Sequence, residues 1–257
     1  MGIYHRIIHL NNYQSKNKKM KFKSILISGV LFTLLSCHVD RIVGVSDEVT
    51  INNVRVSSFT GIEISDDFNA YIRFSDSEER VEIEANENLH RHIIVETIGG
   101  RLIVRTRHHL NIIGRETLNV FITTKRLSDF IAEGDSKITL ENVLVDDDVK
   151  IKVSGDSYFY GEIEANNVEL TALGDSKIDL YGEINTLDAY LAGDSSLTDY
   201  DLTTKDLRIE LSGDSNAYLT VTDYIDIDAS GDSRLHYKGD AEITHQHLTG
   251  DSKIIKL

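Results

Sequence analysis

The tripeptide Gly-Asp-Ser recurs seven times in the second half of this 257-residue chain. Its glycines are separated by 21, 19, 19, 20, 18 and 19 residues, and they are Gly134, Gly155, Gly174, Gly193, Gly213, Gly231 and Gly250. Seven copies at nearly constant spacing are typical of a repeat architecture, in which each copy is one small structural unit. Any fold for this chain must therefore place seven similar units in succession.

The residues around each tripeptide indicate what the unit is. Before the glycine, apolar and polar side chains alternate, as in Val149, Ile151 and Val153, and another apolar residue comes four positions after it. This period of two predicts two strands that bend at the glycine and share one inward face. A unit of about 19 residues cannot bury that face alone, so the units must stack. The leucine and asparagine consensus of leucine-rich repeats is missing. The sequence therefore predicts an all-β fold, a parallel β-helix of about seven coils over residues 127–257.

The corner residues have a structural and a functional interpretation. Glycine takes a positive φ at a corner without steric cost, and Asp and Ser side chains bond readily to backbone amides. The simplest hypothesis is a turn-capping ladder whose carboxylates are Asp135, Asp156, Asp175, Asp194, Asp214, Asp232 and Asp251. Carboxylates stacked about 5 Å apart also suit calcium, which takes oxygen ligands. A serine nucleophile is the weakest alternative, because one active site needs one nucleophile and one base rather than seven copies.

The first 36 residues have the features of a secretory signal. Lys21 and Lys23 precede an apolar run over residues 25–35, which is too short to span a bilayer comfortably. Leu34-Leu35-Ser36-Cys37 follows and resembles the bacterial lipobox, which implies lipid attachment to Cys37 and cleavage just before it. We therefore expect a signal peptide over residues 1–36 and a lipidated tether over residues 37–47. Met20 is a second candidate start, which would make residues 1–19 an upstream extension.

The charge distribution limits the range of partners. Residues 1–36 hold six basic and no acidic side chains, whereas the remainder holds 21 basic and 42 acidic ones. A body with a net charge of −21 repels nucleic acid, so we expect no nucleic-acid partner. Because Cys37 is the only cysteine, an internal disulfide is excluded and stability must come from burial and backbone pairing.

Residues 48–126 are rich in alternating strands but lack the tripeptide, and we expect them to form a smaller β-rich domain before the coils. Two alternating runs, over residues 94–98 and 101–105, flank Gly99-Gly100, which predicts a tight hairpin. One helical turn is expected over residues 86–91.

The order of these elements resembles a known family. The features are Phe59-Thr60-Gly61-Ile62, an acidic strand that runs on to Glu87-Asn88-Leu89, the hairpin Gly99-Gly100-Arg101-Leu102 and then a series of glycine-serine coils. Together they are similar to the family described as "putative auto-transporter adhesin, head GIN domain", common among Bacteroidetes lipoproteins. The resemblance covers about residues 48–257 and implies a right-handed β-helix, export and an adhesin role. It carries over no activity, cofactor or catalytic residue. The aspartate present in all seven corners departs from the family's commoner glycine-serine turn.

We therefore expect an exported cell-envelope lipoprotein with a non-catalytic adhesive or scaffold role. The lipid on Cys37 would hold it on the outer membrane, with the body in the periplasm or at the surface, and its ligand would be a carbohydrate or a protein. The alternatives are a polysaccharide-acting β-helix enzyme, of lyase or glycosidase type, and a calcium-binding module. Spacing singles out no pair of catalytic carboxylates, and the chain has no Trp to stack on a sugar ring. His245 and His247 share one face of a strand and form a candidate metal pair, but the sequence names no further ligand.

Overall fold

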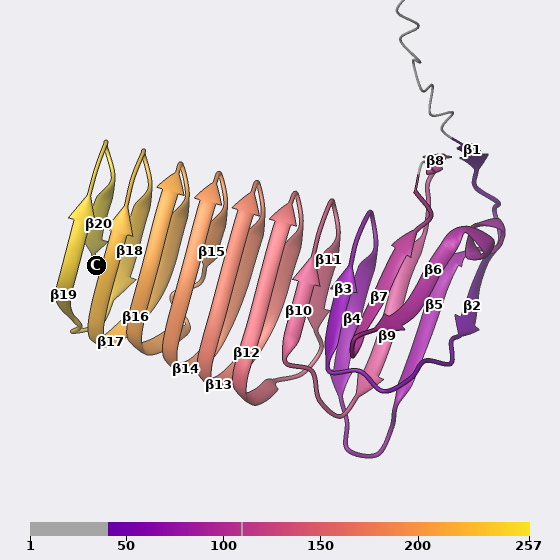
Figure 1. Ribbon diagram of the computed structural model, residues 1–257, viewed down its shortest axis with the longest axis horizontal. Helices are drawn as coiled ribbons and strands as arrows, with labels where there is room; N and C mark the ends of the chain where they lie inside the picture. Colours follow the sequence, from indigo (N-terminus) through magenta and orange to yellow (C-terminus); the bar gives the residue numbers. More distant parts are fainter. Residues whose placement is uncertain (1–40, 109) are drawn as a thin grey trace, which may run out of the picture. The chain divides into compact units, whose positions relative to one another are not determined.

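The computed structural model describes residues 41–108 and 110–257, which form one body built almost entirely of β-strands. The seven Gly-Asp-Ser units are successive coils of a β-solenoid (Figure 1). This confirms the fold class that the repeat predicts. Within the described residues, no helix is long and apolar enough to cross a membrane.

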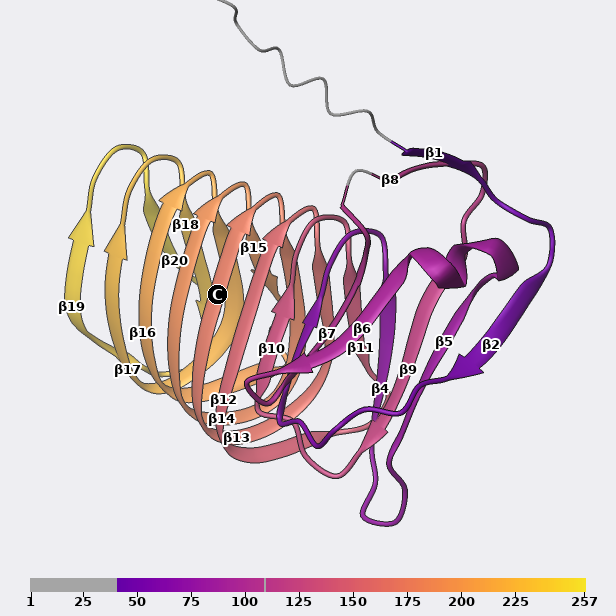
Figure 2. The same cartoon turned by 45° about the vertical axis from the view of Figure 1, so that its right-hand side comes forward.

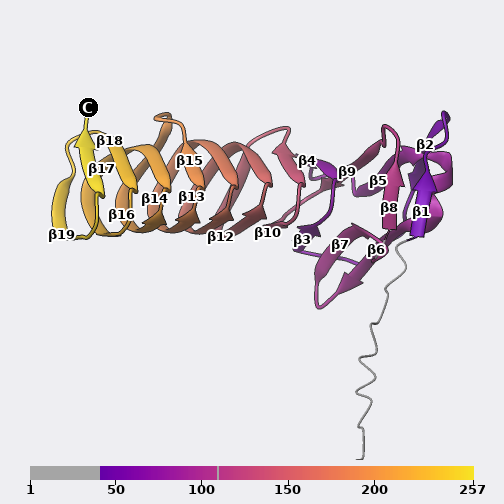
Figure 3. The ribbon, with the colours of Figure 1, turned by 90° about the horizontal axis from the view of Figure 1, so that it is seen from above.

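Each coil has one strand segment that leads to its Gly-Asp-Ser corner and one that leaves it. Seven strands lead to corners: β10 (Asp129–Ala132), β12 (Leu144–Gly155), β13 (Tyr158–Gly174), β14 (Lys177–Gly193), β16 (Leu202–Gly213), β17 (Asn216–Ala229) and β19 (Glu242–Leu248). The segments that leave corners are β11 (Lys137–Leu140), β15 (Ser196–Thr198), β18 (Arg234–Lys238), β20 (Lys253–Lys256) and the first halves of β13, β14 and β17. All these strands pair in parallel, and the coils follow one another from β10 to β19 (Figure 3).

The core of the solenoid consists of inward rows, in which each coil places an apolar side chain directly on that of its neighbour. One such row runs through Phe130, Ile151, Leu170, Ala189, Ile209 and Ile227, all of them buried. Across the core, the ring of Phe159 meets that of Phe130 edge to face, with centroids 5.5 Å apart. Burial of each large side chain stabilises the fold by about 1.5–3 kcal/mol, so the rows rather than any cross-link hold the coils together.

The stack continues toward the N-terminus beyond the first Gly-Asp-Ser unit. Strands β3 (Gly61–Ile64) and β4 (Asn69–Phe74) pair in parallel with β10 and β11. Asp66 takes the place of the corner glycine, with a φ of 64°, and its carbonyl accepts a bond of 3.1 Å from the Asp135 amide. The next layer is formed by β7 (Arg101–Thr106) and β9 (Leu118–Thr124), which pair with β3 and β4. The strands before residue 127 and the strands after it therefore belong to one continuous sheet.

Antiparallel strands lie at the N-terminal end of this stack. Strand β5 (Arg80–Asn86) pairs antiparallel with β9, and β2 (Val49–Asn53) with β5. The predicted hairpin is confirmed, because β6 (Ile93–Ile98) pairs antiparallel with β7 through Gly99 and Gly100, whose φ values are 60° and 82°. The 3-10 helix η1 (Glu87–His92) joins β5 to β6, and β1 (Arg41–Gly44) pairs in parallel with β8 (Leu110–Ile113). These elements lie at the end of the body opposite β19 (Figure 2).

The corner glycines form a column in which side chains have no room. All seven have a φ between 72° and 84°, as the repeat predicts. A Cβ added to Gly193 would lie 2.8 Å from the carbonyl oxygen of Gly174 in the preceding coil. That carbonyl cannot move away, because it accepts a bond of 2.9 Å from the Asp194 amide. Glycine is thus required at these corners by both the φ angle and the approach of the neighbouring coil.

The Gly193→Ala variant tests this requirement. We expect it to lower the free energy of unfolding by about 1–3 kcal/mol more than Gly99→Ala, as measured by urea denaturation. Both glycines have a positive φ, but a Cβ on Gly99 would have no heavy atom within 4 Å, so the pair separates the clash from the φ penalty. Equal losses in the two variants would show that close stacking of the coils does not restrict the corner.

Candidate ligand-binding face

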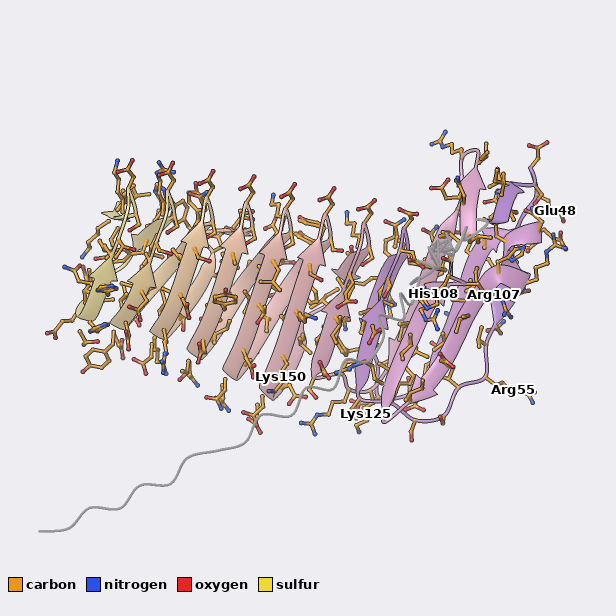
Figure 4. The ribbon with its side chains drawn as sticks, turned by 45° about the horizontal axis from the view of Figure 1, so that its top comes forward. Glu48, Arg55, Arg107, His108, Lys125 and Lys150 are labelled. Atoms are coloured by element: carbon orange, nitrogen blue, oxygen red, sulfur yellow. The ribbon has the colours of Figure 1, made fainter. Side chains whose placement is uncertain are left out.

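The seven aspartates of the Gly-Asp-Ser corners form an exposed row along one edge of the solenoid, here called the corner row. Each aspartate donates its backbone N–H to the preceding coil, as Asp194 does to the carbonyl of Gly174 at 2.9 Å. Asp67 continues the row below Asp135, and its pKa is raised by partial desolvation and by the negative charges of Asp135, Glu116 and Asp66. Side chains project outward along this edge (Figure 4).

The serine hydroxyls cap the corner, and the aspartate carboxylates do not. Ser157 donates to the carbonyl of Gly134 at 3.1 Å, Ser176 to that of Val153 at 3.3 Å and Ser195 to that of Ala172 at 3.1 Å. Among the described residues, no side-chain hydrogen bond joins the corner-row carboxylates to the backbone. The physical reason is the alternation along the chain, which turns the serine into the core and leaves the aspartate before it in solvent. The capping ladder is therefore a ladder of serines and backbone amides.

A second feature is an aromatic cluster on the outward side of the strands that leave the corners. It has two groups of neighbouring rings, which are Tyr158, Tyr160 and Tyr181 and then Tyr200, Tyr218 and His236. All are partly exposed, and together they are called here the aromatic face. The rings of Tyr160 and Tyr181 have centroids 5.9 Å apart, and Tyr218 stacks on His236 at 4.6 Å. Tyr200 meets Tyr218 edge to face at 5.8 Å. Parallel pairing places Tyr218 directly opposite His236, whereas Tyr160 and Tyr181 meet diagonally across neighbouring coils.

Lysines flank the rings of the aromatic face. The Nζ atoms of Lys137 and Lys177 lie 5.0 and 5.6 Å from the centroid of Tyr158, and that of Lys238 lies 4.4 Å from the centroid of Tyr200. Such cation–π contacts fix the rings and place positive charge beside them in an otherwise acidic body.

The pKa values of Tyr158 and Tyr181 are raised, so these two hydroxyls keep their protons near pH 7. Desolvation and a 2.9 Å hydrogen bond to the Asp179 carboxylate raise the pKa of Tyr158, and desolvation with a hydrogen bond to Tyr160 raises that of Tyr181. Desolvation and the charge of Arg234 lower the pKa of His236, which favours its neutral form. The aromatic face thus offers uncharged rings with hydroxyl donors and acceptors, a combination enriched where proteins bind ligands and partners.

The corners on the other side of the coils enclose an open hollow of about 540 Å³. Arg126 forms a bidentate ion pair there with Asp146, at 2.5 and 2.7 Å, and this contact lowers the pKa of that carboxyl. Asn166 donates to Asp147 at 2.6 Å, and Asn185 to Asn166 at 2.6 Å. These polar groups bond to one another along the stack. We therefore interpret them as groups that stabilise these corners rather than as a ligand site. Asp146, Asp147 and Asp148 belong to strand β12.

The remaining residues singled out from the sequence lie apart from the aromatic face. His245 and His247 belong to β19 in the last coil, where His245 lies beside Asp226 and Asp228 of β17. Cys37 lies outside the described residues. The sequence patterns described above do not predict the aromatic face, although the sequence contains a signal for it. Its residues occupy the third, fifth or seventh position after a corner glycine, which the alternation assigns to the outward side.

Comparison with known proteins shows which family has this architecture. Residues 58–241 match the family model described as "Putative auto-transporter adhesin, head GIN domain". The chain belongs to this family. The resemblance seen in the order of the sequence elements is thereby confirmed. No match to the chain was found among curated proteins.

Solved structures share the fold of this head GIN family member. A "putative adhesin" from Bacteroides fragilis has a TM-score of 0.76 at 18% identity, over 84% of this chain and 100% of its own. A "putative lipid binding protein" from Parabacteroides distasonis has a TM-score of 0.68 at 16% identity, over 84% and 100%. A "putative adhesin" from Parabacteroides merdae has a TM-score of 0.67 at 17% identity, over 84% and 99%. At such identities the likeness shows the fold alone.

The division of roles at the corner predicts different effects on stability for substitutions of Ser195 and of Asp194. Ser195→Ala should lower the free energy of unfolding by about 1–2 kcal/mol, because it leaves the Ala172 carbonyl without its hydroxyl partner in a buried position. Asp194→Asn should change the stability by less than about 0.5 kcal/mol, because the exposed carboxylate is replaced and the backbone amide is kept. Urea denaturation of both variants measures the difference. A larger loss for Asp194→Asn would return the capping role to the aspartate.

Proposed function

We propose that this chain is an exported, lipid-anchored protein of the bacterial cell envelope, and that its β-solenoid presents a non-catalytic adhesive surface. Membership in a family described as adhesins supports the adhesive role. The lipobox-like Leu34-Leu35-Ser36-Cys37 after an apolar run supports export and the anchor on Cys37.

The aromatic face is the observation that carries the adhesive part of the proposal. A flat solenoid side suits a large, extended ligand better than a small molecule, which needs a concave pocket. Tyrosine is among the residues that contribute most to binding energy at interfaces, because its ring buries much area while its hydroxyl still forms a hydrogen bond. Here neighbouring coils present such rings side by side, with lysines next to them. The ligand class that fits is a carbohydrate or protein surface rich in neutral polar groups.

The anchor and this face would be compatible in space. Three residues separate Cys37 from β1, which pairs with β8 at the N-terminal end of the body. A lipid on Cys37 would therefore attach near that end, and the coils from β12 to β19 would remain accessible to an envelope or extracellular ligand. This arrangement gives the solenoid the role of a stalk whose outward side chains do the binding.

The anchor predicts a change of compartment in one variant. The wild-type protein should enter the detergent phase of a membrane extract, with an N-terminal mass that shows cleavage before Cys37 and added acyl chains. Cys37→Ala should remove the lipid and shift the protein out of the detergent phase. Gly99→Ala, in the hairpin of the body, serves as the control and should partition like the wild type. A wild-type protein that stays in the aqueous phase and keeps residues 1–36 would end the anchor hypothesis.

The adhesive face predicts a residue-specific loss of binding. The double variant Tyr160→Ala/Tyr218→Ala should reduce adsorption to mucin-coated or matrix-protein-coated surfaces about tenfold or more, which corresponds to about 1.4 kcal/mol. Tyr190→Ala is the matched control, because Tyr190 is an exposed tyrosine on the strand segment that leads to a corner instead. Surface plasmon resonance with folded protein, checked by circular dichroism, measures both. Equal binding by the double variant and the wild type would exclude the aromatic face as the adhesive surface.

A further inference from the structure

Two carboxylates and one imidazole converge on the outward side of the last two coils. Asp226 and Asp228 come from β17 and His245 from β19, and one ligand atom from each lies within 4.8 Å of the other two. Nε2 of His245 lies 3.9 Å from Oδ1 of Asp228. The sequence indicated His245 as one member of a metal pair, and the fold supplies acidic partners that it could not name.

A β-bulge in β19 creates this convergence. Ile243 lies opposite Ile225, but His245 rather than Thr244 lies opposite Asp226, because the register shifts by one residue at this point. Without the extra residue, Thr244 would face Asp226 and the imidazole of His245 would point to the opposite side of the strand. Bulges interrupt the hydrogen-bond ladder locally and often re-aim a side chain at a functional position. The shift thus places His245 over Asp226 and His247 over Asp228.

The donor set fits a transition-metal ion of the zinc class. Imidazole nitrogen and carboxylate oxygen both bind zinc at about 2.0–2.2 Å, and three protein ligands with one water complete a tetrahedral site. Calcium takes oxygen ligands only, so the imidazole argues against it. The side chains of His245 and Asp228 are 58% and 56% exposed, which leaves them free to close the remaining distance by rotation.

The surroundings of the group favour a cation. In the coil below, Glu210 lies opposite Asp228, and Arg208 lies opposite Asp226. Three carboxylates therefore face one guanidinium, and the net local charge is negative. The same side chains line an open hollow of about 250 Å³, together with Asp188 and Tyr190, which gives an ion access from solvent.

The position of the group gives such an ion a structural consequence. Within the described residues, β19 pairs only with β17, and nearly all of its side chains are exposed. Each repeat of a solenoid contacts only its neighbours, so a bond between β19 and β17 acts directly on the pairing that holds β19 in place. An ion bound by Asp226 and Asp228 on β17 and by His245 on β19 would hold β19 against β17.

We propose that Asp226, Asp228 and His245 bind one divalent ion of the zinc class, which clips β19 onto β17 at the C-terminal end of the solenoid. This site is independent of the adhesive face and of the lipid on Cys37.

The test is a zinc titration of the full chain carrying Cys37→Ala, so that neither a lipid nor a thiol competes for the metal. Isothermal titration calorimetry should show a site that Asp226→Asn and His245→Gln each weaken at least about tenfold. His247→Gln is the matched control, since His247 is on the same strand but outside the group, and it should change the affinity less than about threefold. Hydrogen exchange should slow in residues 242–248 on addition of zinc, in the wild type but not in His245→Gln.

Three results would overturn the proposal. They are zinc binding that His245→Gln leaves unchanged, a loss in His247→Gln as large as that in His245→Gln, and protection of residues 242–248 by calcium equal to that by zinc. The tested side chains are on the outward surface, and circular dichroism of each variant shows whether the coils remain folded.

Discussion

In-register parallel pairing is the constraint on which the rest of this structure depends. Each residue of a coil lies directly beside its counterpart in the next, about 4.8 Å away, so every position must be compatible with a near copy of itself. Apolar inward positions satisfy this readily, as the buried row from Phe130 to Ile227 shows. Glycine at the corner satisfies it because the neighbouring carbonyl occupies the space that a side chain would need. The repeat is thus a consequence of stacking.

Charged outward positions cannot repeat the same residue in every coil, because like charges in register would repel one another. On the strands that lead to the corners, one outward row reads Asp129, Lys150, Glu169, Asp188, Arg208 and Asp226, so that opposite charges are neighbours at most steps. On the strands that leave them, Tyr158 lies between Lys137 and Lys177 and separates their charges. The corner row keeps seven like charges, but only at an exposed edge where water and salt screen the repulsion. Electrostatics between neighbouring coils therefore constrains which residues can stand at the outward positions.

The sequence predicts the features that recur with the period of the coils. It does not predict the features at which this period ends or is interrupted. The coils, their inward rows and the positive φ of the corner glycines follow from the spacing of Gly-Asp-Ser. The coil of β3 and β4 has the same geometry but escapes notice, because Asp66 adopts the left-handed conformation in place of glycine and Phe68 replaces the serine. The ion pair of Arg126 and Asp146 joins residues from different layers, and the shift at Thr244 depends on one extra residue. Neither has a periodic signature, so a reading based on periods cannot find them.

The separation of scaffold and surface explains how one fold can serve different ligands. Structures at 16–18% identity share this architecture over 84% of the chain, so the fold tolerates the exchange of most of its residues. Substituting an outward side chain leaves the core unchanged, because alternation places it on the opposite side of the strand from the buried row. A partly exposed tyrosine on such a strand contributes little to the core, yet neighbouring coils bring several of them into contact here. The fold explains why outward side chains of neighbouring coils meet, but it does not require them to be aromatic. The proposed adhesive role is a reason for tyrosine at these positions that the stacking of the coils alone does not supply.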